Sequence, residues 1–333
     1  MSPAHASAAQ PLARPEPAEA PARRPAPHVA VCIATFRRPT GLRRLLDSLA
    51  ALEVPSGMDA PLVIVVDNDA AGSSQPVVAA ARAELPFELV YGVEPERNIA
   101  LARNRGVSMA LERGAAWLAF VDDDETVHPG WLRELLDTRD RLRADVVAGA
   151  VHTRCPADAP GWLAQDRFYA PRGARQDAVL TGAYTGNVLV RATLLAGPRG
   201  PFDARYGLSG GSDSHLFMRL HRGGARIVYA GRAVTTEVVP PARVRPAWVL
   251  RRAYRIGNIA VFCERDLPAG ASSTRIAKAA LRLGLGLASL PLGLLGGRGV
   301  GLRALWNVAY GCGAMAGAVG IRYYEYARPQ TEE

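Results

Sequence analysis

The sequence predicts an α/β protein with a doubly wound, mostly parallel sheet flanked by helices and an apolar helical segment at the C-terminus. Short apolar runs alternate with stretches whose apolar residues recur at helical spacing, which is typical of strand–helix–strand units. The run at residues 117–125, Trp-Leu-Ala-Phe-Val-Asp-Asp-Asp-Glu, stops abruptly at four consecutive acids. Residues 283–297 and 304–321 contain no charged side chain. The first two observations predict the sheet and the third predicts the apolar tail.

The chain of 333 residues is long enough for one large domain or for one domain with an appendage. Residues 1–27 are mostly Ala and Pro and lack the apolar core of a signal peptide, so we expect a disordered tail. Residues 28–264 are expected to form the α/β domain. Residues 265–333 are expected to form a membrane-associated helical tail.

Within the domain, each element follows from its apolar pattern. Strands are predicted at residues 28–34, 61–66, 87–91, 115–121, 145–151, 184–190 and, as a last short strand, 225–230. The first helix is indicated by leucines at i, i+3, i+4 and i+7, namely Leu42, Leu45, Leu46 and Leu49. Further helices are predicted at residues 99–113, from 131 onwards, at 213–220 and at 246–263. Residues 152–180 are rich in Pro and Gly and suit a long loop over a site.

The net charge is +9, and Lys278 is the only lysine among the 40 basic residues. Arginine matches phosphate geometry through its planar fork, so this composition suits phosphate-bearing partners, although a composition bias would look the same. Net charge alone is no specific sign of nucleic-acid binding, and we expect no nucleic-acid partner. The four cysteines show no paired spacing and are expected to be ordinary buried thiols.

The two uncharged C-terminal stretches are marginal as membrane-spanning helices. The first has 15 residues and contains Pro291, and the second has 18 residues and contains Asn307, whereas spanning a bilayer takes about 20. Basic residues precede them and would favour an anionic membrane face; these are Arg265, Arg275, Lys278 and Arg282. Two interpretations remain open: a membrane-embedded or interfacial hairpin, and a buried helical pair packed on the α/β domain.

The acidic cluster at Asp122, Asp123, Asp124 and Glu125 is the main candidate site. Ligands bind at the carboxyl ends of strands in open α/β sheets, and clustered carboxylates repel one another unless a cation joins them. Oxygen ligands suit Mg²⁺ or Mn²⁺. The alternative is a solvated acidic loop that also caps the helix after Pro129.

Polar residues also follow the other predicted strands. Asp67 directly follows one strand and could accept a hydrogen bond from a base or a ribose, or it could simply build a turn. Arg103 lies in the first turns of a predicted helix, where it could reach a phosphate or support the acidic cluster. The chain has no G-x-x-x-x-G-K-[ST] loop and no G-x-G-x-x-G after the first strand, which argues against ordinary P-loop and dinucleotide-binding proteins.

Four motifs in register carry a family resemblance. They are Ala-Thr-Phe-Arg-Arg-Pro, Val-Val-Asp-Asn, Ala-Arg-Asn-Arg-Gly and Phe-Val-Asp-Asp-Asp-Glu. Together they resemble the family 2 glycosyltransferases of the GT-A fold, particularly the non-processive enzymes that build bacterial exopolysaccharides of the succinoglycan type. The resemblance covers about residues 28–260.

The resemblance implies roles for individual residues. The nucleotide would be held by Thr35, Arg37, Asp67, Arg103, Asp122 and Asp123. Asp122 and Asp124 would be the metal-binding pair, with Mg²⁺ or Mn²⁺ bridging the diphosphate. Asp213 would be the catalytic base, although Ser212 stands where the family commonly has an acid. The alternative for Asp213 is a plain first-turn acid of a helix. His215 and Glu237 could line the same cleft or have structural roles.

The implied reaction is the inverting transfer of one sugar from a nucleotide diphosphate sugar, with a UDP-hexose expected first. The Gln-x-x-Arg-Trp motif of processive synthases is absent from the sequence. The acceptor would be a polysaccharide or a glycan linked to a lipid diphosphate, at the cytoplasmic face of the inner membrane. The protein would attach there peripherally or through a C-terminal hairpin.

Two other classes of protein remain as alternatives. A nucleotidyltransferase that makes sugar nucleotides would share the core and the metal, but it would normally carry a Gly-rich basic loop after the first strand. A non-catalytic membrane scaffold would explain the C-terminus, but not the acids and arginines at the strand ends.

Overall fold

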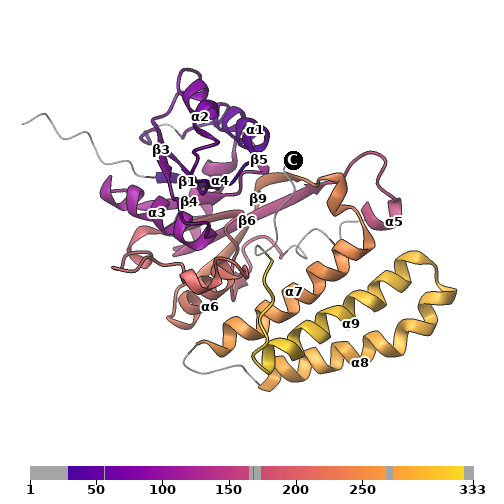
Figure 1. Cartoon of the computed structure of the whole chain (residues 1–333). Coiled ribbons are helices and arrows are strands. Elements are labelled where there is room, and N and C mark those ends of the chain that lie inside the picture. Colours follow the sequence, from indigo (N-terminus) through magenta and orange to yellow (C-terminus); the bar gives the residue numbers. More distant parts are fainter. Residues whose placement is uncertain (1–28, 56, 165–167, 169–173, 268–272, 326–333) are drawn as a thin grey trace, which may run out of the picture.

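The computed structural model describes residues 29–55, 57–164, 168, 174–267 and 273–325. The predicted N-terminal tail, residues 1–27, lies outside them. The described chain forms a sheet with helices on both faces, beside a layer of three long helices (Figure 1).

The sheet has nine strands within the described residues, in the order β3-β2-β1-β4-β8-β6-β9-β5, with β7 also paired to β9. The first four strands along the chain are β1 (Val29–Thr35), β2 (Leu62–Asp67), β3 (Leu89–Val93) and β4 (Trp117–Val121). The others are β5 (Glu125–Val127), β6 (Val146–Arg154), β7 (Val179–Leu180), β8 (Asn187–Arg191) and β9 (Ile227–Val238). Strands β3, β2, β1 and β4 are mutually parallel, and β6 and β9 run the same way. The sheet is therefore mostly parallel, as the sequence predicts, and its functional edge is formed by the carboxyl ends of β1, β2 and β4.

The second half of the sheet departs from the predicted elements in three places. The strand expected at residues 225–230 continues to Val238, because it pairs with β6, β5 and β7 together. A loop was expected at residues 152–180, but its first three residues belong to β6 and its last two form β7. The alternative of a solvated acidic loop does not hold for Glu125, which is buried and starts the short strand β5, paired with β9.

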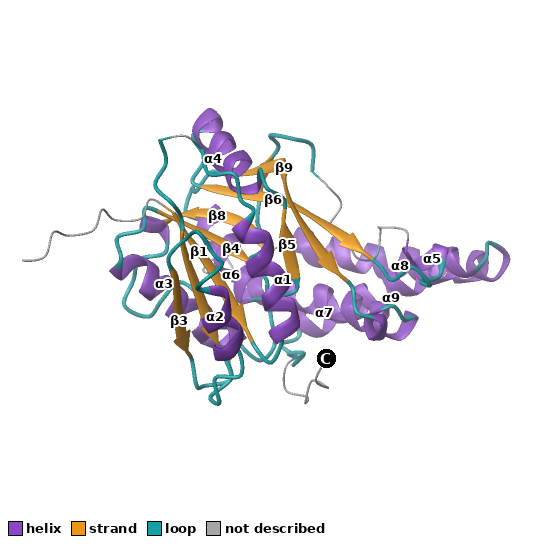
Figure 2. Ribbon diagram, turned by 90° about the horizontal axis from the view of Figure 1, so that it is seen from above, coloured by secondary structure: helices purple, strands orange, loops and turns teal. Residues whose placement is uncertain are grey.

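Helices cover both faces of the sheet (Figure 2). One core joins the sheet to α1 (Pro39–Ala50), α2 (Gln75–Ala81) and α4 (Trp131–Leu142), and the other joins it to α3 (Ile99–Glu112) and α6 (Ser212–Arg222). Successive side chains of a strand point to opposite faces of the sheet, so each strand contributes to both cores. In β1, Val29, Val31 and Ile33 enter the first core, whereas Ala30 and Cys32 enter the second. The sequence analysis did not predict α2.

Three long helices follow: α7 (Pro246–Arg265), α8 (Ser273–Leu295) and α9 (Arg298–Ala318). Helix α9 packs between α7 and α8 (Figure 1). A Cβ atom at Gly257 would lie 2.0 Å from the carbonyl oxygen of Tyr310, and one at Gly313 would lie 1.9 Å from that of Tyr254. Glycine at these positions lets the two backbones approach closely. Cys312, on α9, is exposed, so the expectation that all four thiols are buried is wrong.

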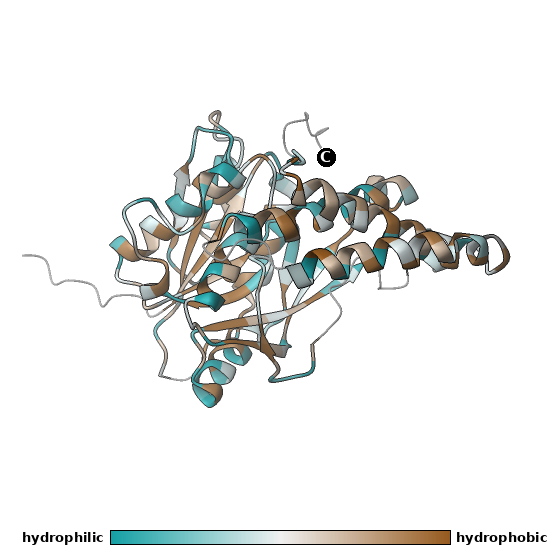
Figure 3. Ribbon diagram, turned by 90° about the horizontal axis from the view of Figure 1, so that it is seen from below, coloured by the Kyte–Doolittle hydropathy of each residue, from teal (hydrophilic) through white to brown (hydrophobic). Residues whose placement is uncertain are grey.

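Helix α8 has a different environment from α9. Among the described residues, one segment, Ser273–Gly293 of α8, is long and apolar enough to cross a membrane, and 11% of it is buried. Figure 3 shows that much of the ribbon of the projecting α8–α9 pair has the colour of hydrophobic residues. The packing of α9 agrees with the interpretation as a buried pair, whereas the surface of α8 keeps the membrane interpretation open.

Candidate functional site

The carboxyl ends of β1 and β4 bring Thr35, Arg38 and Asp123 into contact. The Thr35 hydroxyl donates to Oδ2 of Asp123 at 2.8 Å, and Nη1 of Arg38 donates to Oδ1 of the same carboxylate at 3.0 Å. Asp123 is 5% exposed. It therefore tethers the loop after β4 to the end of β1.

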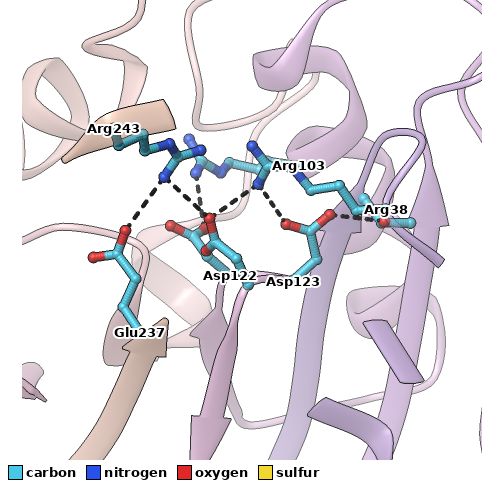
Figure 4. A network of polar contacts seen from close by, with 8 residues as sticks. Arg38, Arg103, Asp122, Asp123, Glu237 and Arg243 are labelled. Carbon is cyan, nitrogen blue, oxygen red and sulfur yellow. Dashed lines mark hydrogen bonds and ion pairs between the residues drawn. The ribbon is translucent and has the colours of Figure 1, made fainter. Parts of the chain in front are cut away.

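Asp122 and Asp124 flank this tether and are more open to solvent. Figure 4 shows Asp122 and Asp123 among the surrounding guanidinium groups. Oδ1 of Asp122 lies 3.3 Å from Nη2 of Arg103, and its side chain is 45% exposed. Oδ2 of Asp124 lies 3.1 Å from Arg38 and 3.5 Å from Arg243. Guanidinium groups thus lie around the carboxylates that the sequence analysis assigned to a metal.

Negative charge is concentrated in a recess at the carboxyl end of β4, which Arg103 and Asp122 line and where Asp124, Glu125 and Glu237 gather. Burial raises the pKa of Asp122, Arg103 opposes the shift, and the charges of Asp124 and Asp213 add to it. Burial and the charge of Asp122 hold the pKa of Glu125 well above its usual range. Oε2 of Glu125 has no hydrogen-bond partner in the described part of the chain. The recess therefore favours an added cation.

The described residues contain no group of three or more His, Cys, Asp or Glu side chains placed to hold a metal ion by themselves. Mg²⁺ is commonly held by one or two carboxylates and completes its shell with water and substrate phosphates. Asp122 and Asp124 fit that kind of site. A metal held in this way would depend on the bound diphosphate.

Asp67 lies in the neighbouring turn and is completely buried. Its carboxylate accepts hydrogen bonds from the backbone N–H groups of Asp69 (3.0 Å) and Ser74 (2.7 Å) and from the Tyr91 hydroxyl (3.0 Å). These are the contacts of a turn-building residue, so contact with a nucleotide stays a prediction. Arg37 is half-exposed and pairs with Asp69 at 3.0 Å.

Arg103 is positioned by the cap of helix α3. The side-chain oxygen of Asn98 accepts from the N–H groups of Ala100 (3.0 Å) and Leu101 (3.3 Å), which starts the helix there. Arg103, one turn further, lies with its guanidinium 5.8 Å from the Phe202 ring centroid and 3.4 Å from the Ser212 hydroxyl. It thus connects the acidic cluster to helix α6.

Asp213 lies in the first turn of α6, as predicted. Gly210 and Gly211 precede the helix with φ of +76° and +93°, a backbone region that favours glycine. Ser212 is buried, and its hydroxyl accepts a hydrogen bond from Arg103. It therefore connects α6 to Arg103 and does not act as a general base. The described hydrogen bonds of the Asp213 carboxylate are local, to the N–H and hydroxyl of Ser214. After burial, the charge of Asp213 is among the causes that raise the pKa of Asp122 and of Tyr184.

His215 and Glu237 have different surroundings. His215 is buried, stacks on Tyr206 with ring centroids 4.9 Å apart, and has a pKa lowered by burial, as expected of a structural side chain. Glu237 contacts Arg243 at 3.4 Å, at the border of the acidic cluster (Figure 4).

Arg38 and Arg243 pair with the acidic cluster, but neither was among the predicted site residues. Arg38 stands in the quoted Ala-Thr-Phe-Arg-Arg-Pro motif, so its position was a usable signal. Arg243 lies 119 residues from Asp124 in the chain, and no local pattern connects them.

A mostly parallel α/β sheet with an aspartate cluster and arginines at its carboxyl edge is the arrangement expected of the GT-A fold. Residues 30–195 match the Glycosyl transferase family 2 profile. The chain is also 36% identical to the succinoglycan biosynthesis protein ExoM of Rhizobium meliloti over 234 residues, which cover 69% of this chain and 73% of ExoM. The chain belongs to glycosyltransferase family 2.

Other relatives agree with this family and fold. Glycosyltransferase AglE of Haloferax volcanii is 24% identical over 70% of this chain and 72% of its own length. The structure of the mannosyltransferase PcManGT from Pyrobaculum calidifontis, in complex with GDP-Man and Mn²⁺, has a TM-score of 0.60 at 17% identity and covers 90% of this chain and 89% of its own. The S. aureus TarS structure has a TM-score of 0.51 at 15% identity; the match covers 78% of this chain and 43% of TarS.

Proposed function

We propose that the protein is an inverting glycosyltransferase that moves one sugar from a nucleotide diphosphate sugar, with a UDP-hexose the first candidate, to a lipid-linked glycan acceptor. The observation that carries this proposal is the recess where Asp122 lies beside Arg103, with Asp124 two residues along the chain and the charge of Asp213 acting on Asp122. It offers carboxylates for a cation, an arginine for phosphate oxygens and a further carboxylate at a helix N-terminus.

The nucleotide-binding residues of this proposal lie at the carboxyl ends of β1, β2 and β4; they are Thr35, Arg37, Asp67, Arg103, Asp122 and Asp123. Thr35 and Asp123 bond each other and shape the floor of the recess. Arg103 is held by α3 with 13% of its side chain exposed, which suits an arginine that meets a diphosphate in one geometry. Asp67 shapes the adjoining turn.

Asp122 and Asp124 would hold Mg²⁺ or Mn²⁺, and a bound divalent ion supplies charge stabilisation for a departing diphosphate. The support is the gathering of carboxylates in the recess: burial first, and then the charges of Asp124 and Asp213, raise the pKa of Asp122. Arg38 and Arg243 hold Asp124 in place, so its orientation depends on the fold.

Asp213 is the proposed base. A carboxylate in the first turn of a helix is stabilised in its charged form by the helix dipole. It would accept the proton of the acceptor hydroxyl while that oxygen attacks the anomeric carbon from the face opposite the diphosphate. The configuration at that carbon then inverts, and an α-linked donor gives a β-linked product.

The acceptor and location rest on the relatives and on α8. ExoM is a succinoglycan biosynthesis protein, which favours a surface polysaccharide as the product of this chain too. The exposed apolar surface of α8 favours attachment to the cytoplasmic face of the inner membrane, peripherally or through the α8–α9 hairpin. A glycan on a lipid diphosphate would present its hydroxyl at that surface.

The test is a panel of UDP- and GDP-hexoses incubated with the protein, with and without Mn²⁺, with release of UDP or GDP as the readout. We expect one donor to be turned over in a metal-dependent manner and Asp124→Ala to abolish the release. Asp213→Asn should keep nucleotide binding by calorimetry but lower the rate of transfer by about 10²- to 10⁴-fold, the usual contribution of a general base.

Asp47→Asn serves as the matched control, because Asp47 is an exposed acid on α1 that pairs with Arg43, outside the recess. Failure of both UDP and GDP to bind with Mn²⁺ present would remove the proposal of sugar transfer. Formation of a sugar nucleotide from a nucleoside triphosphate would instead identify a nucleotidyltransferase. A fully active Asp213→Asn variant would remove Asp213 as the base.

A further inference from the structure

A groove of about 530 Å³ opens between α7, α8 and α9, lined by other residues than the catalytic recess. Its polar lining includes Arg275, Lys278 and Arg282 from α8, with Glu264 from α7 and Tyr310 from α9. The sugar-transfer proposal assigns no role to this basic groove.

The groove carries a net positive charge. Glu264 is the one acid that lines it within the described chain, and it already pairs with Arg222 at 3.0 Å and Arg275 at 2.7 Å. Lys278 and Arg282 form no hydrogen bond or ion pair with any residue that the structure describes. Their charges therefore remain available to an anionic ligand.

Arg282 is held in one place by aromatic rings. Its guanidinium lies 4.5 Å from the ring centroid of Tyr310 and 5.1 Å from that of Trp306, and the two rings are stacked on each other at 5.5 Å. A guanidinium over ring faces keeps its in-plane N–H groups for other acceptors. The planar donor fork suits the oxygens of a phosphate.

An apolar surface adjoins the groove on the same helix. Leu281 and Leu285 follow Lys278 at i+3 and i+7, so the three side chains lie on one side of α8. Five leucines of this helix are more than half exposed: Leu281 (62%), Leu285 (60%), Leu287 (51%), Leu292 (61%) and Leu295 (88%). Basic side chains beside an uncharged, exposed helix face match a molecule with an anionic head and apolar chains.

We propose that this groove binds the phosphate headgroup of an anionic membrane lipid, with the lipid chains against the leucines of α8. The groove supplies Lys278 and Arg282 to the phosphate oxygens, and Tyr310 holds Arg282 in place. This proposal rests on the membrane attachment proposed above and is independent of the sugar-transfer reaction. It makes the attachment selective for the headgroup rather than purely hydrophobic.

The test measures sedimentation of the full chain with vesicles of phosphatidylcholine alone and with vesicles that also contain phosphatidylglycerol. The variants are Lys278→Gln and Lys278→Gln/Arg282→Gln. The matched control is Arg44→Gln/Arg199→Gln, which removes the same charge from exposed positions outside α7, α8 and α9. We expect the wild type and the control to prefer the anionic vesicles, and the double groove variant to lose about 10- to 30-fold of that affinity.

Each other outcome overturns a defined part of the proposal. Equal binding of the wild type to both vesicles would exclude headgroup recognition, and equal losses in the groove and control variants would show diffuse attraction only. Loss of the preference upon addition of millimolar inorganic phosphate would identify a site for free phosphate instead. Absence of binding to either vesicle would remove the membrane attachment itself. Nucleotide binding by calorimetry, which should be unchanged in all variants, reports separately on the catalytic recess.

Discussion

Asn187 shows how much one buried polar side chain contributes to this fold. It is 3% exposed, at the start of β8. Its amide nitrogen donates to the carbonyl oxygens of Ala150 (2.9 Å) and Ala233 (2.8 Å), and its oxygen accepts from the Trp131 indole N–H at 2.8 Å. The side chain thus joins β6, β9 and α4.

We expect Asn187→Leu to lower the free energy of unfolding by at least about 3 kcal/mol. Three buried groups lose their partners, and each orphaned group costs about 1–3 kcal/mol. Denaturant unfolding would measure the loss. Trp131→Phe is the graded control, because it removes one of the three bonds and should cost less. A loss for Asn187→Leu no larger than that of Trp131→Phe would contradict this account.

The carboxylates of the acidic cluster differ in role although they are adjacent in sequence. Asp123 bonds Thr35 and Arg38 inside the protein, whereas Asp122 and Asp124 face the recess. The position of the cluster could be predicted from the apolar run before it. Which carboxylate is the tether could not, because that depends on where Thr35 and Arg38 come to lie.

Among the elements, α7 and α9 have the closest packing. Gly257 of α7 faces the Tyr310 carbonyl of α9, and a Cβ atom there would lie only 2.0 Å from the carbonyl oxygen. Gly284 of α8, by contrast, has nothing within 4 Å of the place where a Cβ would be. Replacement of glycine by alanine should therefore have opposite effects on the stability of the protein at the two positions.

We expect Gly257→Ala to destabilise the protein by about 1–3 kcal/mol, because the helix backbones must separate to fit the methyl group. Gly284→Ala should stabilise it by about 0.5–1 kcal/mol, because alanine loses less backbone entropy in an exposed helix interior. Thermal unfolding of the two variants provides the measurement. Shifts of the same sign would show that α7 and α9 are not packed in this way.

In the whole molecule, α7, α9 and α8 form a layer that projects from the sheet domain (Figure 2). Removal of α8 and α9 would uncover Val261 of α7, which packs with Ala279 of α8 and Ala314 of α9. A truncation would therefore confuse loss of membrane contact with loss of folding. Substitution of the exposed leucines is the cleaner test of attachment.

We expect Leu281→Gln/Leu285→Gln/Leu292→Gln to move the protein from the membrane to the soluble fraction, because these side chains are exposed and their apolar area is what a bilayer would bury. Cell fractionation would measure the shift, and calorimetry should show unchanged nucleotide binding. Val179→Gln, an exposed apolar residue on β7, is the control and should stay with the membrane. A triple variant that remains in the membrane pellet would place the attachment elsewhere.

Local patterns in the sequence were enough to predict the α/β class, the strands that lead to Thr35, Asp67 and Asp122, and the first-turn position of Asp213. Each of these depends on a local pattern: a buried strand is an apolar run, and a helix repeats its apolar residues every three to four positions. The residues at the ends of such runs are then brought together by a parallel sheet, whatever the rest of the chain does.

Long-range contacts set the antiparallel insertion of β8, the pairing of β5 with β9, and the arginines that hold Asp124. They also distinguish the two C-terminal helices, which have similar uncharged composition: α9 is covered on both sides, and α8 keeps an exposed face. These features depend on contacts between segments far apart in the chain. Such contacts are selected by the packing of whole surfaces, and no short stretch of sequence records which surface will be its neighbour.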